Sequence, residues 1–304
     1  MTRWEGEAFL AEARAWIEAT VTATGEIEQP HVRPWSTVLR VPTSGGAVFF
    51  KAALPELAHD VVVTRTLARL RPDLVLAPLA VDLDRKWMLL PDGGERLREL
   101  IAREPRPRPW YDVLPAYADL QLASPDGLDG MVEQGLPDLR LGRITETAER
   151  LAAELGEQAP ARGRFATLCA ELAAFGIPET IQHDDLHDGN VFAGEGGYRI
   201  FDWGDSVAAH PFLSLVVALR GIAYRFELGD GDPELERLRD AYLERFSEYG
   251  KPAELRRAAA LAEPLGMLSR AWSWWRVASN VPDPAEFSQA GRQWFREFAA
   301  AVPS

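Results

Sequence analysis

The stretch Gln182-His183-Asp184-Asp185-Leu186-His187-Asp188-Gly189-Asn190 decides the fold, together with Asp202, which follows twelve residues after the asparagine. The spacing H-x-D-L-x-x-x-N with a later aspartate is typical of phosphoryl-transfer sites. In such sites one carboxylate accepts a hydroxyl proton, while an asparagine and an aspartate hold magnesium on ATP. The chain has only two asparagines, Asn190 and Asn280, so one at this offset is a strong signal. A solvated polar loop is the alternative.

The residues after this loop predict a β-hairpin. Two short apolar runs, 190–193 and 198–202, flank the glycine-rich turn 194–197. Pairing Ala193 with Tyr198 would set Asn190 opposite Phe201, so that the Asn190 amide and the Asp202 carboxylate lie at the same open end. Two oxygen donors, together with substrate phosphates, suit magnesium.

A cation for the phosphates is expected upstream, at Lys51. Of 33 basic residues only Lys51, Lys86 and Lys251 are lysines, and Lys51 directly follows the apolar run 47–50. An ammonium at the end of a strand is a compact charge that can reach nucleotide phosphates. Alternatively, Lys51 is a solubilising charge on an edge strand.

The run from Pro55 to Leu70 predicts a helix that would supply an acidic partner for Lys51. Asp60 is the favoured partner and Glu56 the alternative, although acidic residues in a first turn also suit the helix dipole. Ahead of Lys51 there is no G-x-G-x-x-G. The loop from Arg33 to Val38 would contact phosphates through backbone N–H groups and the Ser36 and Thr37 hydroxyls, or it is an ordinary hairpin tip.

Taken together, His183 to Asn190, Asp202 and Lys51 resemble the aminoglycoside phosphotransferase family, the small-molecule kinases of the protein-kinase-like fold. In that family the loop commonly reads H-G-D-L-H-x-G-N, and the second metal aspartate sits in I-D-W or a similar triplet. The resemblance implies an α+β bilobal fold, ATP with Mg²⁺ as cofactors, and transfer of the γ-phosphoryl group to a hydroxyl of a small molecule.

Carried over by residue, the resemblance assigns Asp185 as the catalytic carboxylate. It assigns Asn190 and Asp202 as magnesium ligands and Lys51 as the contact to the α- and β-phosphates. His183 would fix the loop backbone. His187 would support the loop and touch the transferred phosphoryl group.

Three positions depart from the family pattern. Asp184 replaces a small residue and Asp188 replaces the common proline, so their charges must be solvated or paired. Ser214 stands where the family often has an aspartate, so the packing under the loop should differ.

The expected organisation has two lobes. Residues 1–91 would form a small nucleotide-binding lobe with a five-stranded antiparallel sheet, including strands near 74–81 and 87–90. Residues 92–304 would form a larger, mostly helical catalytic and acceptor-binding lobe. The hinge would begin near Leu90, whose backbone could hydrogen-bond adenine.

The acceptor should lie between Asp185 and the C-terminal helices. Candidate contacts are Asp205, which could pair with an acceptor ammonium or an internal arginine, and Trp272, in the tryptophan-rich run 270–276. The tryptophans are alternatively core residues. Aminoglycosides, amino sugars, macrolides and amino alcohols are the acceptor classes considered.

Composition narrows the function classes. The net charge of -13 and the pI near 5.0 argue against nucleic acid as a partner. The single cysteine, Cys169, allows no intrachain disulfide and suits a cytoplasmic protein. No apolar stretch is long enough for a membrane span, and the N-terminus is not a secretory signal. Oligomeric state, ATP versus GTP and any link to antibiotic resistance are not fixed by the sequence.

Two other functions fit parts of the motif. A metal-dependent hydrolase could use the cluster His183, Asp185 and His187 as ligands for zinc or manganese, with no role for Lys51. A catalytically idle kinase-like protein could bind ATP without turnover, as the altered positions 184 and 188 would allow.

Overall fold

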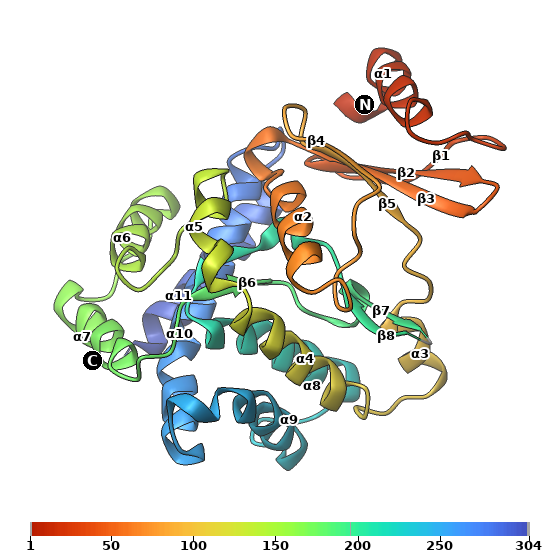
Figure 1. The fold of residues 1–304 in the computed structure, drawn as a ribbon. Coiled ribbons are helices and arrows are strands. Elements are labelled where there is room, and N and C mark those ends of the chain that lie inside the picture. The colour runs from red at the N-terminus through yellow and green to blue at the C-terminus, as the bar shows by residue number, and fades with distance from the viewer. Residues whose placement is uncertain (1, 195, 303–304) are drawn as a thin grey trace.

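An antiparallel sheet of five strands forms the N-terminal part of the chain (Figure 1). The computed structural model describes residues 2–194 and 196–302. The strands lie in the order β1-β2-β3-β5-β4. Their bounds are β1 Glu28–Val32, β2 Ser36–Thr43, β3 Gly46–Ala53, β4 Ala80–Asp82 and β5 Trp87–Pro91. The predicted α+β fold with a five-stranded sheet is therefore confirmed.

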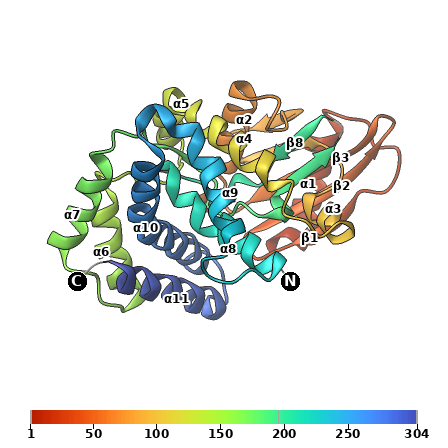
Figure 2. The same ribbon diagram turned by 90° about the horizontal axis from the view of Figure 1, so that it is seen from below.

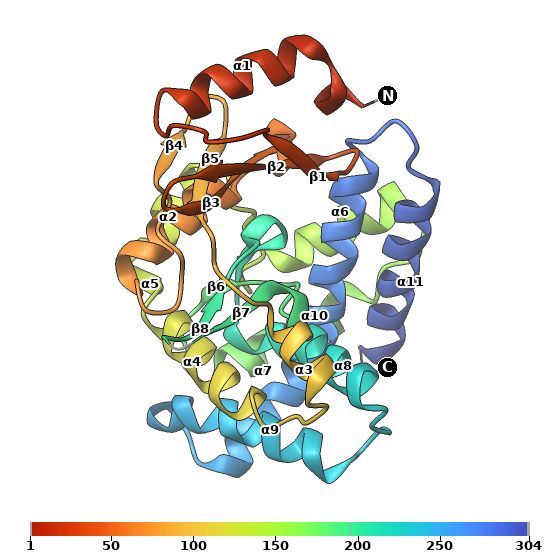
Figure 3. The same ribbon diagram turned by 90° about the vertical axis from the view of Figure 1, so that its right-hand side faces the viewer.

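Side chains of β3 alternate between the two faces of this sheet. Phe50 packs with Trp16 and Trp87 in an aromatic cluster beneath helix α1 (Glu7–Glu18). The neighbouring Lys51 therefore points to the opposite face, toward helix α2 (Asp60–Leu70). Figure 3 shows α1 covering one side of the sheet while the helical part of the molecule lies on the other.

Two predicted elements in this part are shorter than expected. The strand predicted near 74–81 forms only as β4, Ala80–Asp82, because Leu74 and Val75 turn into the helical core and Pro78 follows them. The predicted helix from Pro55 divides into a 3-10 turn (Pro55–Leu57) and α2. Asp60 thereby becomes the first residue of α2.

Helices dominate the chain after β5, as Figure 2 shows from below. A two-stranded pair, β6 (Thr180–Gln182) and β9 (Val207–Ala209), precedes and follows the predicted active-site segment. The helices are α3 Leu97–Arg103, α4 Trp110–Leu122, α5 Pro125–Glu133, α6 Ile144–Leu155, α7 Arg162–Ala173, α8 Leu215–Phe226, α9 Pro233–Leu243, α10 Pro252–Ala278 and α11 Ala285–Ala301. No helix in the ranges 2–194 and 196–302 combines the length and apolarity that crossing a membrane requires.

The hairpin predicted after the loop is present as β7 (Val191–Gly194) and β8 (Gly197–Ile200). Ala193 pairs with Tyr198, and the Phe201 N–H donates to the Asn190 carbonyl at 3.1 Å. The predicted register is therefore confirmed. Glu195, in the predicted turn, lies outside the described residues.

The sheet and the helices meet at a small apolar cluster. The turn between β1 and β2 carries Trp35, whose ring lies 5.3 Å from that of Phe287 on α11. Leu57 and Val277 are buried in the same cluster. The nucleotide-side loop predicted from the sequence is thus anchored to the C-terminal helices. A domain boundary at residue 91 stays a prediction.

Candidate active site

His183 holds the loop between β6 and β7 by its ring and its backbone. Nδ1 accepts the Asp185 N–H at 3.3 Å, and Nε2 lies 2.9 Å from the Phe201 carbonyl, so Nε2 carries the proton. Burial lowers the pKa of His183, which keeps the ring neutral. The ring also packs on buried Trp203 at 4.7 Å. Both nitrogens are committed to the backbone, which is the task predicted for this residue.

A buried polar network supports the loop from below. The Tyr117 hydroxyl accepts the His183 N–H at 2.9 Å and lies 2.6 Å from Ser214 Oγ. Ser214 donates in turn to Gln182 Oε1 at 2.5 Å. Ser214, at the sequence position where the family pattern often has an aspartate, thus links Tyr117 and Gln182 through its hydroxyl. The packing under the loop therefore depends on a network of neutral hydroxyl and amide groups instead of a carboxylate.

Asp185 lies at the centre of the site. Its Oδ1 accepts from Arg270 Nη2 at 2.8 Å, and its Oδ2 accepts from Asn190 Nδ2 at 3.2 Å. His187 Nε2 is 3.5 Å from the same Oδ2. Although burial opposes ionisation, Arg270 and His187 lower the pKa of Asp185 to about 2. The carboxylate is therefore ionised and held in one orientation at neutral pH.

Lys51 forms two ion pairs, one with Asp60 of α2 and one with Asp202 after the hairpin. Its Nζ is 2.7 Å from Asp60 Oδ2 and 2.6 Å from Asp202 Oδ1. Burial disfavours the ammonium, but the two carboxylates raise the pKa of Lys51 above its ordinary value. Of the two acidic residues weighed from the sequence, Asp60 makes the contact. The carbonyl of Glu56 instead accepts from Arg276 on α10 at 2.6 Å.

The donors at the hairpin end fit a magnesium ion on the nucleotide. Asn190 uses Nδ2 for Asp185, which leaves its Oδ1 for a metal. Asp202 lies two residues after the end of β8, adopts a left-handed φ of 64° and presents a carboxylate beside Lys51. One carboxylate and one amide oxygen, with substrate phosphates, match the preference of Mg²⁺ for few protein ligands.

A histidine-based metal site is not favoured. In residues 2–194 and 196–302 no group of three His, Cys, Asp or Glu side chains could hold a metal ion. His183, which the hydrolase alternative requires as a ligand, has both ring nitrogens engaged by backbone groups.

A second layer of charge surrounds the loop on the α10 side. Arg270, which is 11% exposed, contacts the Asp184 carbonyl and Asp205 Oδ2, both at 3.2 Å, in addition to Asp185. The alternative in which Asp205 pairs with an internal arginine is thus the one found. Asp184 is buried, and its Oδ2 accepts from Ser273 Oγ at 2.9 Å.

The structure corrects the choice of tryptophan. Trp272 is buried against Trp275 and beneath Arg150 of α6, on the opposite side of α10 from Arg270. Residues two apart on a helix point about 200° from one another, whereas residues four apart share a face. Trp274 is therefore the ring beside the site, with the Arg270 guanidinium 5.1 Å from its centroid.

The predicted nucleotide contacts near β2 and β5 have mixed outcomes. Thr37 lies within β2, is fully buried, and donates its hydroxyl to the His31 carbonyl at 2.9 Å, so the predicted phosphate contact is not favoured. Ser36 begins β2 and is also buried, at the end of the turn that Arg33 opens. Leu90 lies one residue beyond the last pairing of β5 with β4, so its proposed contact to adenine stays a prediction.

Sequence reasoning missed two partners of the loop. Arg98 on α3 and Arg225 on α8 both bind Asp188, the residue that replaces the common proline. The unusual aspartate was the available signal, because a charge there had to be paired. Its partners, 90 and 37 residues away, could not be named from the sequence.

Comparisons with known proteins identify the family and the fold. A family model described as the phosphotransferase enzyme family matches residues 26–261. Ethanolamine kinase from Plasmodium vivax is similar in structure, with a TM-score of 0.61 at 10% identity over 91% of this chain and 84% of that chain. Macrolide 2′-phosphotransferase MphH from Brachybacterium faecium gives 0.56 at 15% identity over 97% and 99%.

The GDP and kanamycin complex of APH(2″)-IIIa gives a TM-score of 0.56 at 12% identity, over 95% of this chain and 98% of that chain. At these identities the structural likeness shows the fold alone. No curated protein sequence matches the chain.

Proposed function

The chain belongs to the phosphotransferase enzyme family, as its motifs predicted, and on this premise we propose that it transfers the γ-phosphoryl group of ATP to a hydroxyl of a small molecule. The observation that carries the proposal is that Lys51 reaches Asp202 across 151 residues of sequence, at the end of the hairpin that follows the Asp185 loop. Lys51 contacts Asp202 at 2.6 Å, and Asp185 contacts Asn190 at 3.2 Å.

In this proposal Lys51, held by Asp60, binds the α- and β-phosphates. Asn190 and Asp202 hold Mg²⁺, which would neutralise charge on the phosphates when bound. Asp185 orients the acceptor hydroxyl and takes its proton as the new bond forms. Because phosphoryl transfer depends mainly on positioning and electrostatics, a carboxylate held by Arg270 and Asn190 suits this task even with a pKa of about 2.

The acceptor class is left to experiment. The similar structures include an ethanolamine kinase, a macrolide phosphotransferase and a kanamycin complex, so the fold is compatible with different acceptors. The purified protein would be incubated with Mg-ATP and amino alcohols, amino sugars, aminoglycosides or macrolides, and ADP release would be followed in a coupled assay.

Three variants make the test specific. Asp185→Asn should abolish acceptor-dependent ADP release while nucleotide binding persists, because the amide cannot accept the proton. Lys51→Ala should weaken nucleotide binding. The control Lys251→Ala should not, because Lys251 is an exposed residue at the N-terminal end of α10. Turnover that survives Asp185→Asn would refute the assignment. ATP binding without turnover for any acceptor would favour the catalytically idle alternative.

A further inference from the structure

Two arginines frame the catalytic loop on the side away from Lys51. Arg98 Nη2 lies 3.3 Å from Asp188 Oδ1 and 3.4 Å from His187 Nδ1. Arg225 Nε lies 2.6 Å from Asp188 Oδ2. His187 Nε2 is in turn 3.5 Å from Asp185 Oδ2. The imidazole ring of His187 therefore lies between Arg98 and the proposed catalytic carboxylate.

Arg98 and Arg225 carry two positive charges, and the single carboxylate of Asp188 neutralises only one of them. Asp188 is 8% exposed on its side chain, whereas Arg98 and Arg225 are 46% and 40% exposed. Among the described contacts, Arg225 uses only Nε and Arg98 only Nη2, so further N–H groups on both face solvent. A guanidinium fork of this kind is suited to a carboxylate or phosphate group.

Arg98 is a built part of the loop rather than a free surface side chain. A Cβ added at Gly189 would lie 2.3 Å from Arg98 Nη2 and 2.7 Å from its Cζ. The guanidinium thus occupies the space that the missing side chain at Gly189 leaves. A Cβ added at Gly221 of α8 would lie 3.6 Å from the Cβ of His187. Helix α8 therefore packs directly beside the same loop.

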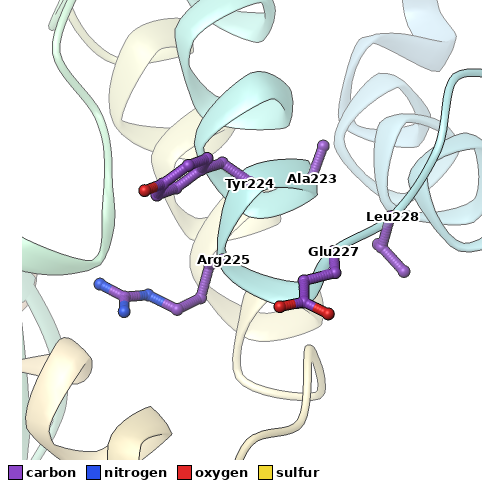
Figure 4. Close-up of a pocket in the computed structure, with 5 residues that line it drawn as sticks. All are labelled: Ala223, Tyr224, Arg225, Glu227 and Leu228. Carbon is purple, nitrogen blue, oxygen red and sulfur yellow. The ribbon is translucent and has the colours of Figure 1, made fainter.

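An open pocket of about 510 Å³ adjoins Arg225 at the end of α8. Figure 4 shows Tyr224 and Arg225 projecting to the same side of the helix, while Leu228 points to the other. Tyr224 is 87% exposed, an unusual position for a large aromatic ring. Glu227 also lines the pocket but forms no ion pair with either arginine in the described residues. The pocket is open to solvent, and its walls come from residues between 223 and 228 at the end of α8.

We propose that Arg98 and Arg225, oriented by Asp188, form an anion subsite for the acceptor, so that the acceptor carries a carboxylate or phosphate group near its reacting hydroxyl. Tyr224 supplies an aromatic face and a hydroxyl to the same ligand. The carboxylates on the opposite side of Asp185 do not offer a matching cation site, because Arg270 already pairs with Asp185 and Asp205. This inference rests on the proposed function, because it names the class of acceptor.

Sulfate binding tests the subsite without knowledge of the acceptor. Calorimetric titration with sulfate would be done in saturating Mg²⁺ and a non-hydrolysable ATP analogue, so that the nucleotide phosphate site is filled. Arg225→Gln and Arg98→Gln should each weaken binding at least about tenfold, as expected for one charge-assisted contact. Arg256→Gln is the matched control, because Arg256 is 49% exposed and paired with Asp240 at 2.7 Å elsewhere.

Equal sulfate affinity in all four proteins, or no sulfate binding to the wild type, would overturn the inference. Displacement of sulfate by the nucleotide analogue would also overturn it, because the arginines would then serve the nucleotide. Thermal unfolding of each variant checks that it is folded. The two arginines lie on different helices, α3 and α8, so misfolding would not account for the loss of sulfate binding in both variants.

A ligand series with one scaffold tests the preferred charge. D-glucuronate, D-glucose and D-glucosamine share ring hydroxyls and differ in charge, and glucuronate should compete best with sulfate. That preference should vanish in Arg225→Gln. A preference for glucosamine would overturn the inference while leaving the phosphotransferase proposal intact. Failure of the wild type to bind Mg-ATP would instead count against the proposed function.

Discussion

Replacing Asp184 with asparagine should stabilise the protein, and increasingly so as the pH rises. Asp184 is 1% exposed, and its Oδ1 is buried without a partner among the described residues, as is Ser269 Oγ close by. Its backbone φ of 59° is a left-handed conformation that asparagine tolerates. The asparagine oxygen could keep the bond from Ser273, while its NH₂ donates to Ser269.

The pH dependence follows from where the proton is bound. Burial, reinforced by Asp205, raises the pKa of Asp184 to about 7, against an ordinary value of 3.8. Between these values the native state holds a proton that the unfolded chain has released, so stability from this group is lost as the pH rises. At about 1.36 kcal/mol per pKa unit, the cost to the native state is below about 1 kcal/mol at pH 4 and rises to about 4 kcal/mol at pH 8.

Urea unfolding of the wild type and Asp184→Asn would be compared from pH 5 to pH 8.5. The gain in free energy of unfolding should grow across this range and level off above pH 7. Asp283→Asn removes the same charge from an exposed position and should change stability by less than about 0.5 kcal/mol at every pH. A gain that is equal at both ends of the range, or absent at pH 8, would refute the reasoning.

Three further substitutions test the supports of the site. Arg270→Gln removes the cation that lowers the pKa of Asp185, so the acid limb of the pH–rate profile should move upward from about pH 2. The free energy of unfolding should fall by about 3 kcal/mol. An acid limb that does not move would contradict the pairing of Arg270 with Asp185. Tyr117→Phe should cost about 1–3 kcal/mol in urea unfolding, because the His183 N–H and Ser214 lose a buried partner. Gly266→Ala should destabilise α10 by about 1–3 kcal/mol, since the added Cβ would lie 2.6 Å from the Leu213 carbonyl; a gain in thermal midpoint, usual for glycine to alanine in a helix, would disprove this clash.

The hairpin and the position of Asn190 and Asp202 at its open end could be predicted because they depend on local sequence. Turn residues fix the pairing of Ala193 with Tyr198, and strand alternation then sets Asn190 and Asp202 at one end. The partner of Lys51 could be narrowed to two acidic residues by the same local reasoning. Distinguishing Asp60 from Glu56 required the break between the 3-10 turn and α2.

Contacts between distant elements could not be predicted. Arg270 meets Asp185 across 85 residues, and its position follows from how α10 crosses the loop rather than from any local pattern. The tryptophans at 272 and 274 are equivalent in sequence terms, and only the direction of Arg270 tells which one faces the site. Thr37 failed as a phosphate contact for a related reason. A hydroxyl next to a turn looks accessible, but β2 begins at Ser36 and turns it inward.

Two of the three departures from the family pattern, Asp188 and Ser214, have partners on other elements of the fold. Asp188 is paired with two arginines, and Ser214 acts with Tyr117 to hold the loop. Both substitutions therefore come with partners from other elements that preserve the loop geometry. Because a buried charge needs a partner for stability in an active and in an idle protein alike, the pairing of Asp188 shows that the loop is held in place, and the acceptor assay decides activity.

Asp184 is the exception, because one of its oxygens has no partner and its charge is costly at neutral pH. If that cost is retained for function, Asp184→Asn should stabilise the fold while changing the kcat or KM of the phosphoryl transfer, since the carboxylates of Asp184 and Asp185 both interact with the charge of Arg270. If stability rises and both kinetic constants stay the same, the buried charge of Asp184 only lowers stability and has no role in phosphoryl transfer.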